Sequence, residues 1–222
     1  MTKSERVFGF VFIPLQSVVL PILLWIIYGL IGFEPVDPYD SLIYYAVSFF
    51  LVLVVMFRFL KASFSDFIGG LWNSIKALIL GYILYRVLLF AASLLLARVM
   101  GGTNPNQEAV IKEISSTYRV MIVVTVILAP IVEEPLFRGV LFGVIRQKNR
   151  ALAYIISVVL FCVFHLWAYI VFDFSWDNLL YLAQYVPASI ALAWCYERSG
   201  TIWTPIILHA VHNLLSTLQY KS

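Results

Sequence analysis

The 222-residue sequence has little charge, because only 12% of its residues are Asp, Glu, Lys or Arg, about half the share in an ordinary soluble domain. This scarcity, combined with 62% apolar residues, excludes a water-soluble globular protein and a disordered chain. The net charge of +3 gives no basis for a nucleic-acid partner. Such a composition is instead typical of a protein that crosses a lipid bilayer several times.

Cysteine is also scarce, with two residues in the whole chain. Cys162 and Cys195 both fall within apolar stretches, which excludes a disulfide framework and indicates two small buried side chains. Familiar catalytic signatures are missing as well. We find no His-Glu-x-x-His pair and no Gly-x-Ser-x-Gly turn, and every aspartate lies between the apolar runs.

Seven apolar runs are long enough to cross a bilayer, which takes about 20 helical residues. They predict an all-α, polytopic integral membrane helix bundle with seven transmembrane helices, or eight if one of the longer runs is divided. We expect residues 1–222 to form a single membrane domain, with a short surface helix around residues 108–114. The runs cover residues 8–33, 41–60, 71–100, 118–146, 151–171, 179–196 and 201–218.

Basic residues near the ends of the runs predict the orientation, since cytoplasmic loops carry an excess of Lys and Arg. With the N-terminus inside, eight basic residues lie on the cytoplasmic side and four on the other. We therefore predict a multi-pass protein of the cell membrane with a cytoplasmic N-terminus. The eight are Lys3, Arg6, Arg58, Lys61, Arg146, Lys148, Arg150 and Arg198, and the four are Arg98, Lys112, Arg119 and Lys221.

A few polar side chains fall deep inside the apolar runs, where an ionisable group is costly and usually functional. With a rise of about 1.5 Å per helical residue, Glu134, His165 and Asn213 lie roughly 18, 21 and 18 Å from the predicted cytoplasmic ends of their runs. Three separate helices therefore bring polar groups to one common depth. The deep set consists of Glu133, Glu134, Arg138, His165, His209 and Asn213.

Helical periodicity assigns faces to these residues. Glu134 and Arg138 are four residues apart and share a side, whereas Glu133 lies about 100° further round. We predict that Glu134 pairs with Arg138 as structural support and that Glu133 points into a cavity. Pro130 and Pro135 flank the glutamates and remove helix hydrogen bonds. The sequence thus predicts a bent, water-reachable pocket, with the carbonyl groups of residues 126 and 131 left without their usual donors.

A carboxylate and two imidazoles in one pocket suit hydrolysis. Glu133 could take a proton from an attacking water, while His165 holds that water or protonates the leaving amine. His209 and Asn213 could then donate hydrogen bonds to the oxyanion. Alternatively, Glu133, His165 and His209 could bind a catalytic Zn²⁺. Residue types alone leave both the zinc and the metal-independent mechanism open.

Two other classes of protein remain as alternatives at this point. A proton-coupled transporter also buries Glu, His and Arg at mid-depth, although it usually shows a repeated half, and we find no internal repeat. A non-catalytic bacteriocin-immunity or scaffold protein could keep the same fold and bind a partner peptide with its helices. Peptide cleavage that is lost when Glu133 is replaced would distinguish a protease from a transporter and from a scaffold protein.

Three ordered motifs on successive polar helices resemble the CAAX-protease and bacteriocin-processing family of intramembrane proteases, also called CPBP or Abi. The resemblance covers roughly residues 116–218, and residues 1–100 carry no motif that we recognise. The motifs are Glu133-Glu134-Pro-Leu-Phe-Arg138, Phe161-Cys-Val-Phe-His165 and His209-Ala-Val-His-Asn213, and they are similar to the family signatures Glu-Glu-x-x-x-Arg, Phe-x-x-x-His and His-x-x-x-Asn.

This resemblance implies an all-helical membrane protease that cuts a membrane-associated peptide or protein near the bilayer. It places Glu133, His165, His209 and Asn213 in the catalytic site, with Glu134 and Arg138 in support. Eukaryotic members of the family trim prenylated C-terminal tails, whereas bacterial members are associated with bacteriocin immunity or peptide maturation.

Overall fold

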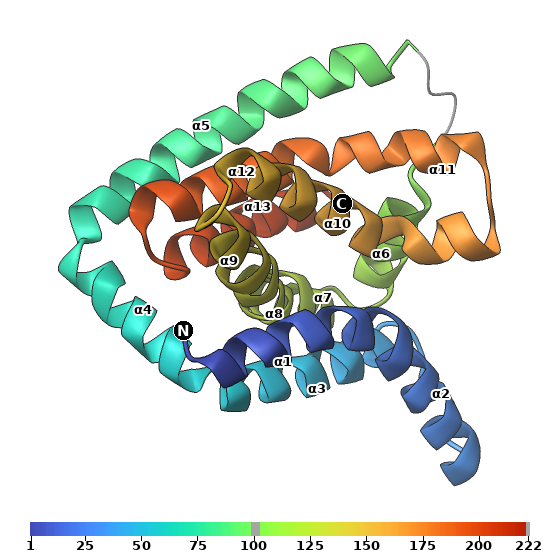
Figure 1. Ribbon diagram of the computed structural model, residues 1–222. Coiled ribbons are helices and arrows are strands. Elements are labelled where there is room, and N and C mark those ends of the chain that lie inside the picture. The colour runs from blue at the N-terminus through green and yellow to red at the C-terminus, as the bar shows by residue number, and fades with distance from the viewer. Residues whose placement is uncertain (99–102, 221–222) are drawn as a thin grey trace.

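The computed structural model describes residues 1–98 and 103–220, and every regular element in these ranges is helical (Figure 1). The predicted all-α fold is confirmed. Two residues of the predicted third run, 99 and 100, and Lys221 lie outside the described residues. Up to residue 96 the elements are α1 (Lys3–Pro14), η1 (Leu15–Val19), α2 (Leu20–Ile31), α3 (Tyr39–Val55), α4 (Phe57–Gly69) and α5 (Leu71–Leu96).

The later elements include two further π-helical segments, η2 and η3, beside the π-helical η1, and one 3₁₀ helix, η4. The predicted surface helix is present as α6. In chain order these elements are α6 (Pro105–Ser116), α7 (Tyr118–Ile122), η2 (Val123–Leu128), α8 (Ala129–Glu134), η3 (Pro135–Phe142), α9 (Gly143–Arg146), α10 (Arg150–Phe172), α11 (Trp176–Tyr181), η4 (Leu182–Gln184), α12 (Val186–Ser199) and α13 (Trp203–Gln219).

Five continuous helices among the described residues are long and apolar enough to cross a membrane, so the chain is a multi-pass membrane protein. The number becomes six if α3 and α4 form one bent span, and the predicted number of seven is therefore approximate. The five are Lys3–Ile31, Leu71–Leu96, Tyr118–Arg146, Arg150–Phe172 and Trp176–Ser199.

Two of the predicted spans differ in detail from the structure. The second, 41–60, is broken at Met56, where the chain bends by 79° and then continues as α4 to Gly69. The last, 201–218, is present as α13, whose 17 helical residues are at the lower end of the length that can cross a bilayer.

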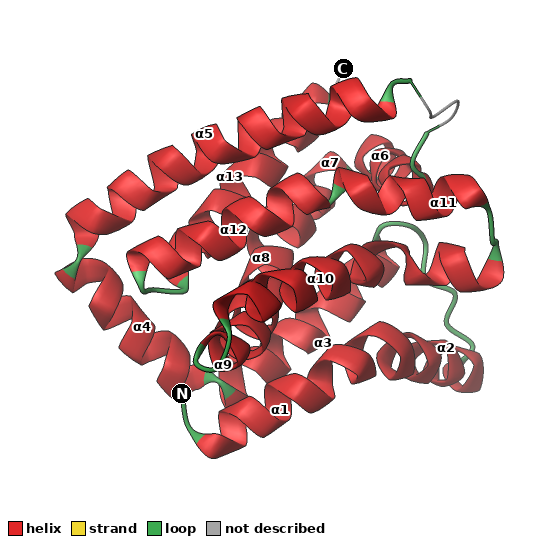
Figure 2. Ribbon diagram, turned by 45° about the horizontal axis from the view of Figure 1, so that its top comes forward, coloured by secondary structure: helices red, strands yellow, loops and turns green. Residues whose placement is uncertain are grey.

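The helix Tyr118–Arg146 lies at the centre of the bundle. In its most apolar window 56% of the residues are buried, against 11% in Lys3–Ile31. Helix α1 packs on η3, α3 on α8, α10 on η3, and α13 on both η2 and α8. Figure 2 shows α8 near the middle of the molecule, and α5 runs along α12 in both ribbon views. The residues predicted to do chemistry on α8 and η3 are thus enclosed by other helices.

The N-terminal helix is fixed to α4 at one point and to this central helix at another. The Glu5 carboxylate accepts hydrogen bonds from the backbone N–H groups of Thr2 at 2.6 Å and Phe59 at 2.8 Å. Gly9 brings the α1 backbone so close to η3 that a Cβ atom there would lie 2.4 Å from Cγ2 of Val140. One carboxylate therefore serves the first turns of both α1 and α4, and one glycine permits the close approach.

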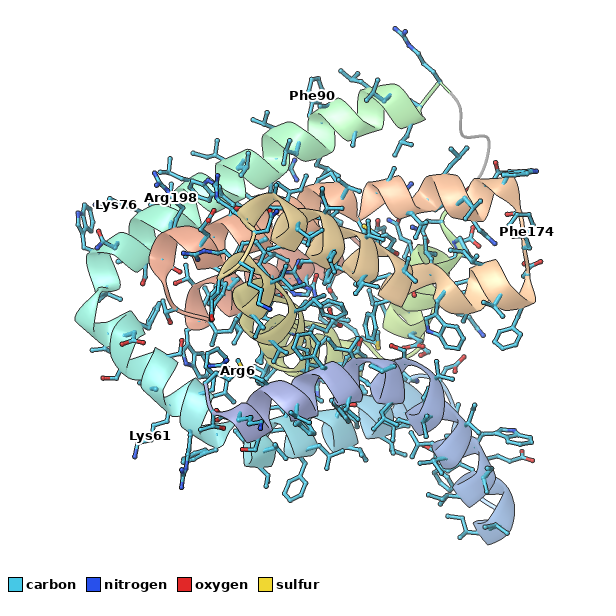
Figure 3. All side chains as sticks on the ribbon, in the orientation of Figure 1. Arg6, Lys61, Lys76, Phe90, Phe174 and Arg198 are labelled. Atoms are coloured by element: carbon cyan, nitrogen blue, oxygen red, sulfur yellow. The ribbon has the colours of Figure 1, made fainter. Side chains whose placement is uncertain are left out.

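Four basic side chains lie on one side of the molecule. In Figure 3, Arg6, Lys61, Lys76 and Arg198 lie in the left half of the view, whereas Phe174 lies at the right edge. Basic residues grouped on one side are what the orientation argument requires of the cytoplasmic side. The cytoplasmic N-terminus stays a prediction.

Candidate active site

Glu133 lies on α8 in the wall of a cavity of about 1270 Å³. Its side chain is 3% exposed, and the two carboxylate oxygens have different surroundings. Oε1 accepts a hydrogen bond from the Tyr45 hydroxyl at 2.9 Å. Oε2 is buried without a hydrogen-bond partner among the described residues, and it lies 4.0 Å from Nε2 of His165. One carboxylate oxygen of Glu133 is therefore hydrogen-bonded, and the other is free to accept a hydrogen bond.

His165 comes from α10 and lines the same cavity. Its Nδ1 lies 2.8 Å from the backbone oxygen of Phe161, one turn earlier. A carbonyl oxygen can only accept, so Nδ1 carries the hydrogen and Nε2 of the neutral ring is an acceptor. The ring stacks on Tyr185 with centroids 4.5 Å apart. The Tyr185 hydroxyl in turn accepts hydrogen bonds from Asn104 and Asn106 at the start of α6.

Glu134 and Arg138 form the predicted ion pair. The Arg138 Nη1 and Glu134 Oε1 atoms are 3.2 Å apart, and both side chains are fully buried. Arg138 also donates to the backbone oxygen and hydroxyl of Ser189 on α12, and its guanidinium lies 4.1 Å from the centroid of the Phe161 ring. A charge buried this deeply persists only when it is paired in this way.

His209 lies on α13 and lines the cavity, with Nδ1 directed to Glu134 at 2.7 Å. The Glu134 Oε1 atom thus serves both Arg138 and His209. We predicted His209 as a partner of the substrate oxyanion, and the contact with Glu134 leaves only Nε2 for that purpose. Glu134 consequently positions both the Arg138 guanidinium and the His209 imidazole.

Asn213, one turn further along α13, also lines the cavity. Its amide donates to the backbone oxygen of Thr125 at 2.7 Å. In the π-helical η2 the N–H of Ala129 reaches back five residues to Val124. The next donor in that register would be Pro130, which has no N–H, so the Thr125 carbonyl needs another partner. Asn213 supplies it.

This register adds the Thr125 carbonyl to those that Pro130 affects. The prediction for Val126 assumed α-helical bonding four residues back from Pro130, whereas η2 bonds five residues back and leaves Thr125 without a backbone donor. Two π-helical segments flank the glutamates, and all eight residues of η3 are buried. Such segments within helices often accompany functional sites.

The four predicted catalytic side chains, Glu133, His165, His209 and Asn213, all line the one cavity, whereas Glu134 and Arg138 lie behind its wall. The predicted zinc ligands are Glu133, His165 and His209. Among residues 1–98 and 103–220, no three His, Cys, Asp or Glu side chains are placed to hold a metal ion. His209 directs Nδ1 to Glu134 and keeps Nε2 as its remaining ligand atom, but the three predicted ligands are not grouped as a three-ligand zinc site in the described residues.

Two tyrosines near the site did not follow from the sequence motifs. Tyr45 contacts Glu133 across 88 residues of sequence, and Tyr85 on α5 lies 3.1 Å from Nε2 of His212 through its hydroxyl. His212 is not one of the signature residues of the three motifs, and its contact with Tyr85 is separate from those of His209 and Asn213. No local spacing could have indicated either pair, since each joins helices far apart in the chain.

Comparisons with known proteins agree with the three motifs. Residues 115–215 match the family described as type II CAAX prenyl endopeptidase Rce1-like. The predicted family resemblance is confirmed. Residues 115–215, called the Rce1-like segment, contain every predicted catalytic residue, and they extend from the end of α6 into α13.

Relatives of this chain come from several bacteria. The putative membrane peptidase YdiL of Bacillus subtilis is 31% identical over 51% of this chain and 42% of its own length. The UPF0177 protein YxdF of Lactococcus lactis is 35% identical over 40% of this chain and 43% of its own length. The membrane-embedded CAAX protease MroQ of Staphylococcus aureus is 25% identical over 61% of this chain and 53% of its own length.

The chain thus spans about half the length, or less, of these relatives. No solved structure matches it.

Proposed function

We propose that this protein is an intramembrane endopeptidase that hydrolyses a peptide bond of a membrane-associated peptide or protein, with Glu133 as the general base. The observation that carries the proposal is the meeting of Glu133 and His165 on one cavity wall inside an apolar bundle. The match to the Rce1-like family and the names of the relatives support the same reaction class.

The first step, binding of the attacking water, uses Oε2 of Glu133, which has no hydrogen-bond partner among the described residues. Oε2 and the His165 Nε2 atom are 4.0 Å apart, and both are acceptors. A water about 2.8 Å from each would donate one hydrogen to Oε2 and the other to Nε2. Its lone pair then faces the cavity, where the substrate carbonyl would lie. Glu133 and His165 together would orient the water for attack.

The reaction then follows the usual course of amide hydrolysis. The water oxygen bonds to the peptide carbonyl carbon while Glu133 takes one of its protons, which leaves a tetrahedral oxyanion. When the C–N bond breaks, the proton held by Glu133 passes, directly or through His165, to the leaving nitrogen. The products are a carboxylic acid and an amine, which exchange the remaining proton to become a carboxylate and an ammonium group, and Glu133 is again ionised. No step requires a covalent bond to the protein.

His209 and Asn213 are proposed to stabilise the oxyanion. Glu134 accepts from Nδ1 of His209, so a protonated His209 ring would donate from Nε2 into the cavity. One N–H of the Asn213 amide is used by Thr125, and the other remains as a donor. Because Zn²⁺ lacks a fitting ligand set here, we derive no step through a metal.

Purified full-length protein in lipid vesicles, incubated with a mixture of apolar peptides and analysed by mass spectrometry, tests the proposal. We expect wild type to cleave and Glu133→Gln to lose cleavage. Glu197→Gln is the matched control, because Glu197 pairs with Arg150 outside the cavity. Cleavage that survives in Glu133→Gln, or no cleavage by wild type, would overturn the proposal in favour of a scaffold or transport protein.

A further inference from the structure

Tyr45 lies in the middle of α3, in the half of the chain that precedes the Rce1-like match. Its hydroxyl nevertheless donates to Oε1 of Glu133 at 2.9 Å. This is the hydrogen bond that the structure gives to the Glu133 carboxylate, and it comes from a neighbouring helix. Helix α3 packs on α8, so the donor and the carboxylate are held on facing helices.

The Tyr45 hydrogen bond makes the two oxygens of Glu133 inequivalent. A glutamate carboxylate rotates freely about its last torsion, which has broad minima. With Oε1 held by Tyr45, the plane of the carboxylate is fixed and Oε2 is turned toward His165, 4.0 Å from Nε2. Without the hydroxyl, either oxygen could swing away from His165.

We infer that Tyr45 is a positioning residue for Glu133: it occupies Oε1 and thereby keeps Oε2 directed at the water beside His165. The inference rests on the proposed function, because it assigns Tyr45 a part in orienting the general base. It also makes the catalytic centre depend on the N-terminal half of the chain, outside residues 115–215.

The position of Tyr45 is itself well defined. Its ring packs against the buried core cluster that contains Val132 and Leu136, and it makes an edge-to-face contact with Tyr44 at 5.0 Å. The Tyr44 hydroxyl instead donates to the backbone oxygen of Gln16 at 3.2 Å. The two neighbouring tyrosines thus differ in what their hydroxyls bind, and Tyr44 provides a matched control.

Steady-state cleavage by Tyr45→Phe and Tyr44→Phe tests the inference. We expect Tyr45→Phe to lower kcat by about 10- to 100-fold, since a base displaced by about 1 Å can cost that much, with KM close to the wild-type value. Tyr44→Phe should keep kcat near the wild-type value. An unchanged kcat in Tyr45→Phe, or an equal loss in both variants, would overturn the assignment.

A double-mutant cycle on melting temperature provides a readout that does not need activity. If the hydroxyl acts on Glu133, Tyr45→Phe shifts the melting temperature in wild type but much less in a Glu133→Leu background, where no acceptor for the hydroxyl remains. The same pair of measurements with Tyr44→Phe should be additive. Additive shifts for Tyr45→Phe would contradict the contact. If wild type cleaves nothing while the cycle is non-additive, the proposed function fails although the contact holds.

Discussion

Substitution of Arg138 by glutamine tests how the site is supported. The Arg138–Glu134 pair is completely buried, with 0% exposure of both side chains. The neutral amide would leave the Glu134 charge with His209 as its remaining partner and would weaken the contacts to Ser189. Removal of one partner from a buried ion pair costs about 3–5 kcal/mol. For a chain of this size, that corresponds to a fall in melting temperature of roughly 6–20 °C.

Thermal unfolding of purified protein in detergent measures this effect. The control is Arg146→Gln, because Arg146 pairs with Glu197 at 3.5 Å while its side chain is 41% exposed; an exposed pair contributes at most about 1 kcal/mol. We expect Arg138→Gln to melt well below the control and to lose cleavage, since Glu134 also holds His209. If Arg138→Gln matches Arg146→Gln in melting temperature and still cleaves, the supporting role is refuted.

Three further predictions follow from other parts of the chain. Gly9→Ala is expected to lower the free energy of unfolding by about 1–3 kcal/mol, because the added Cβ would clash with Val140. Gly29→Ala is the control, because a Cβ there would meet open space. Equal melting temperatures of the two variants would contradict the prediction. Burial raises the pKa of Glu113 on α6, so its contribution to stability is greatest at low pH and is lost as the pH rises through the raised pKa. Glu113→Gln should therefore melt above wild type at pH 7, with a difference that shrinks toward pH 4, and a difference independent of pH would refute the reasoning. Treatment with EDTA should leave cleavage unchanged, because the described His, Cys, Asp and Glu side chains include no three placed to hold a metal; loss of cleavage that Zn²⁺ restores would contradict this.

Local periodicity was enough to predict part of the site. Glu134 and Arg138 are four residues apart on one helix, so their pairing follows from the helical repeat. The common depth of Glu134, His165 and Asn213 followed from counting residues along three apolar runs. His165 and Asn213 line one cavity together with Glu133 and His209. These inferences needed only the rise and the turn of a helix.

Other contacts depend on how helices pack and could not be predicted. The hydrogen bond from Tyr45 joins residues 88 positions apart, and nothing in the sequence marks Tyr45 above the other tyrosines. The partner of Asn213 depends on the five-residue bonding of η2, whereas the sequence argument considered only the α-helical register and so did not include the Thr125 carbonyl. The break at Met56 was missed because residues 40–68 contain neither proline nor glycine, the residues that usually mark a sharp bend.

A single-turnover cleavage in H₂¹⁸O tests most directly whether Glu133 acts as a base on water. With excess wild-type protein, we expect one ¹⁸O atom in the new carboxylate of the peptide product and none in the tryptic peptide that contains Glu133. If ¹⁸O instead enters the Glu133 carboxylate while the product carries ordinary oxygen, Glu133 attacks the substrate itself, and the general-base account is wrong.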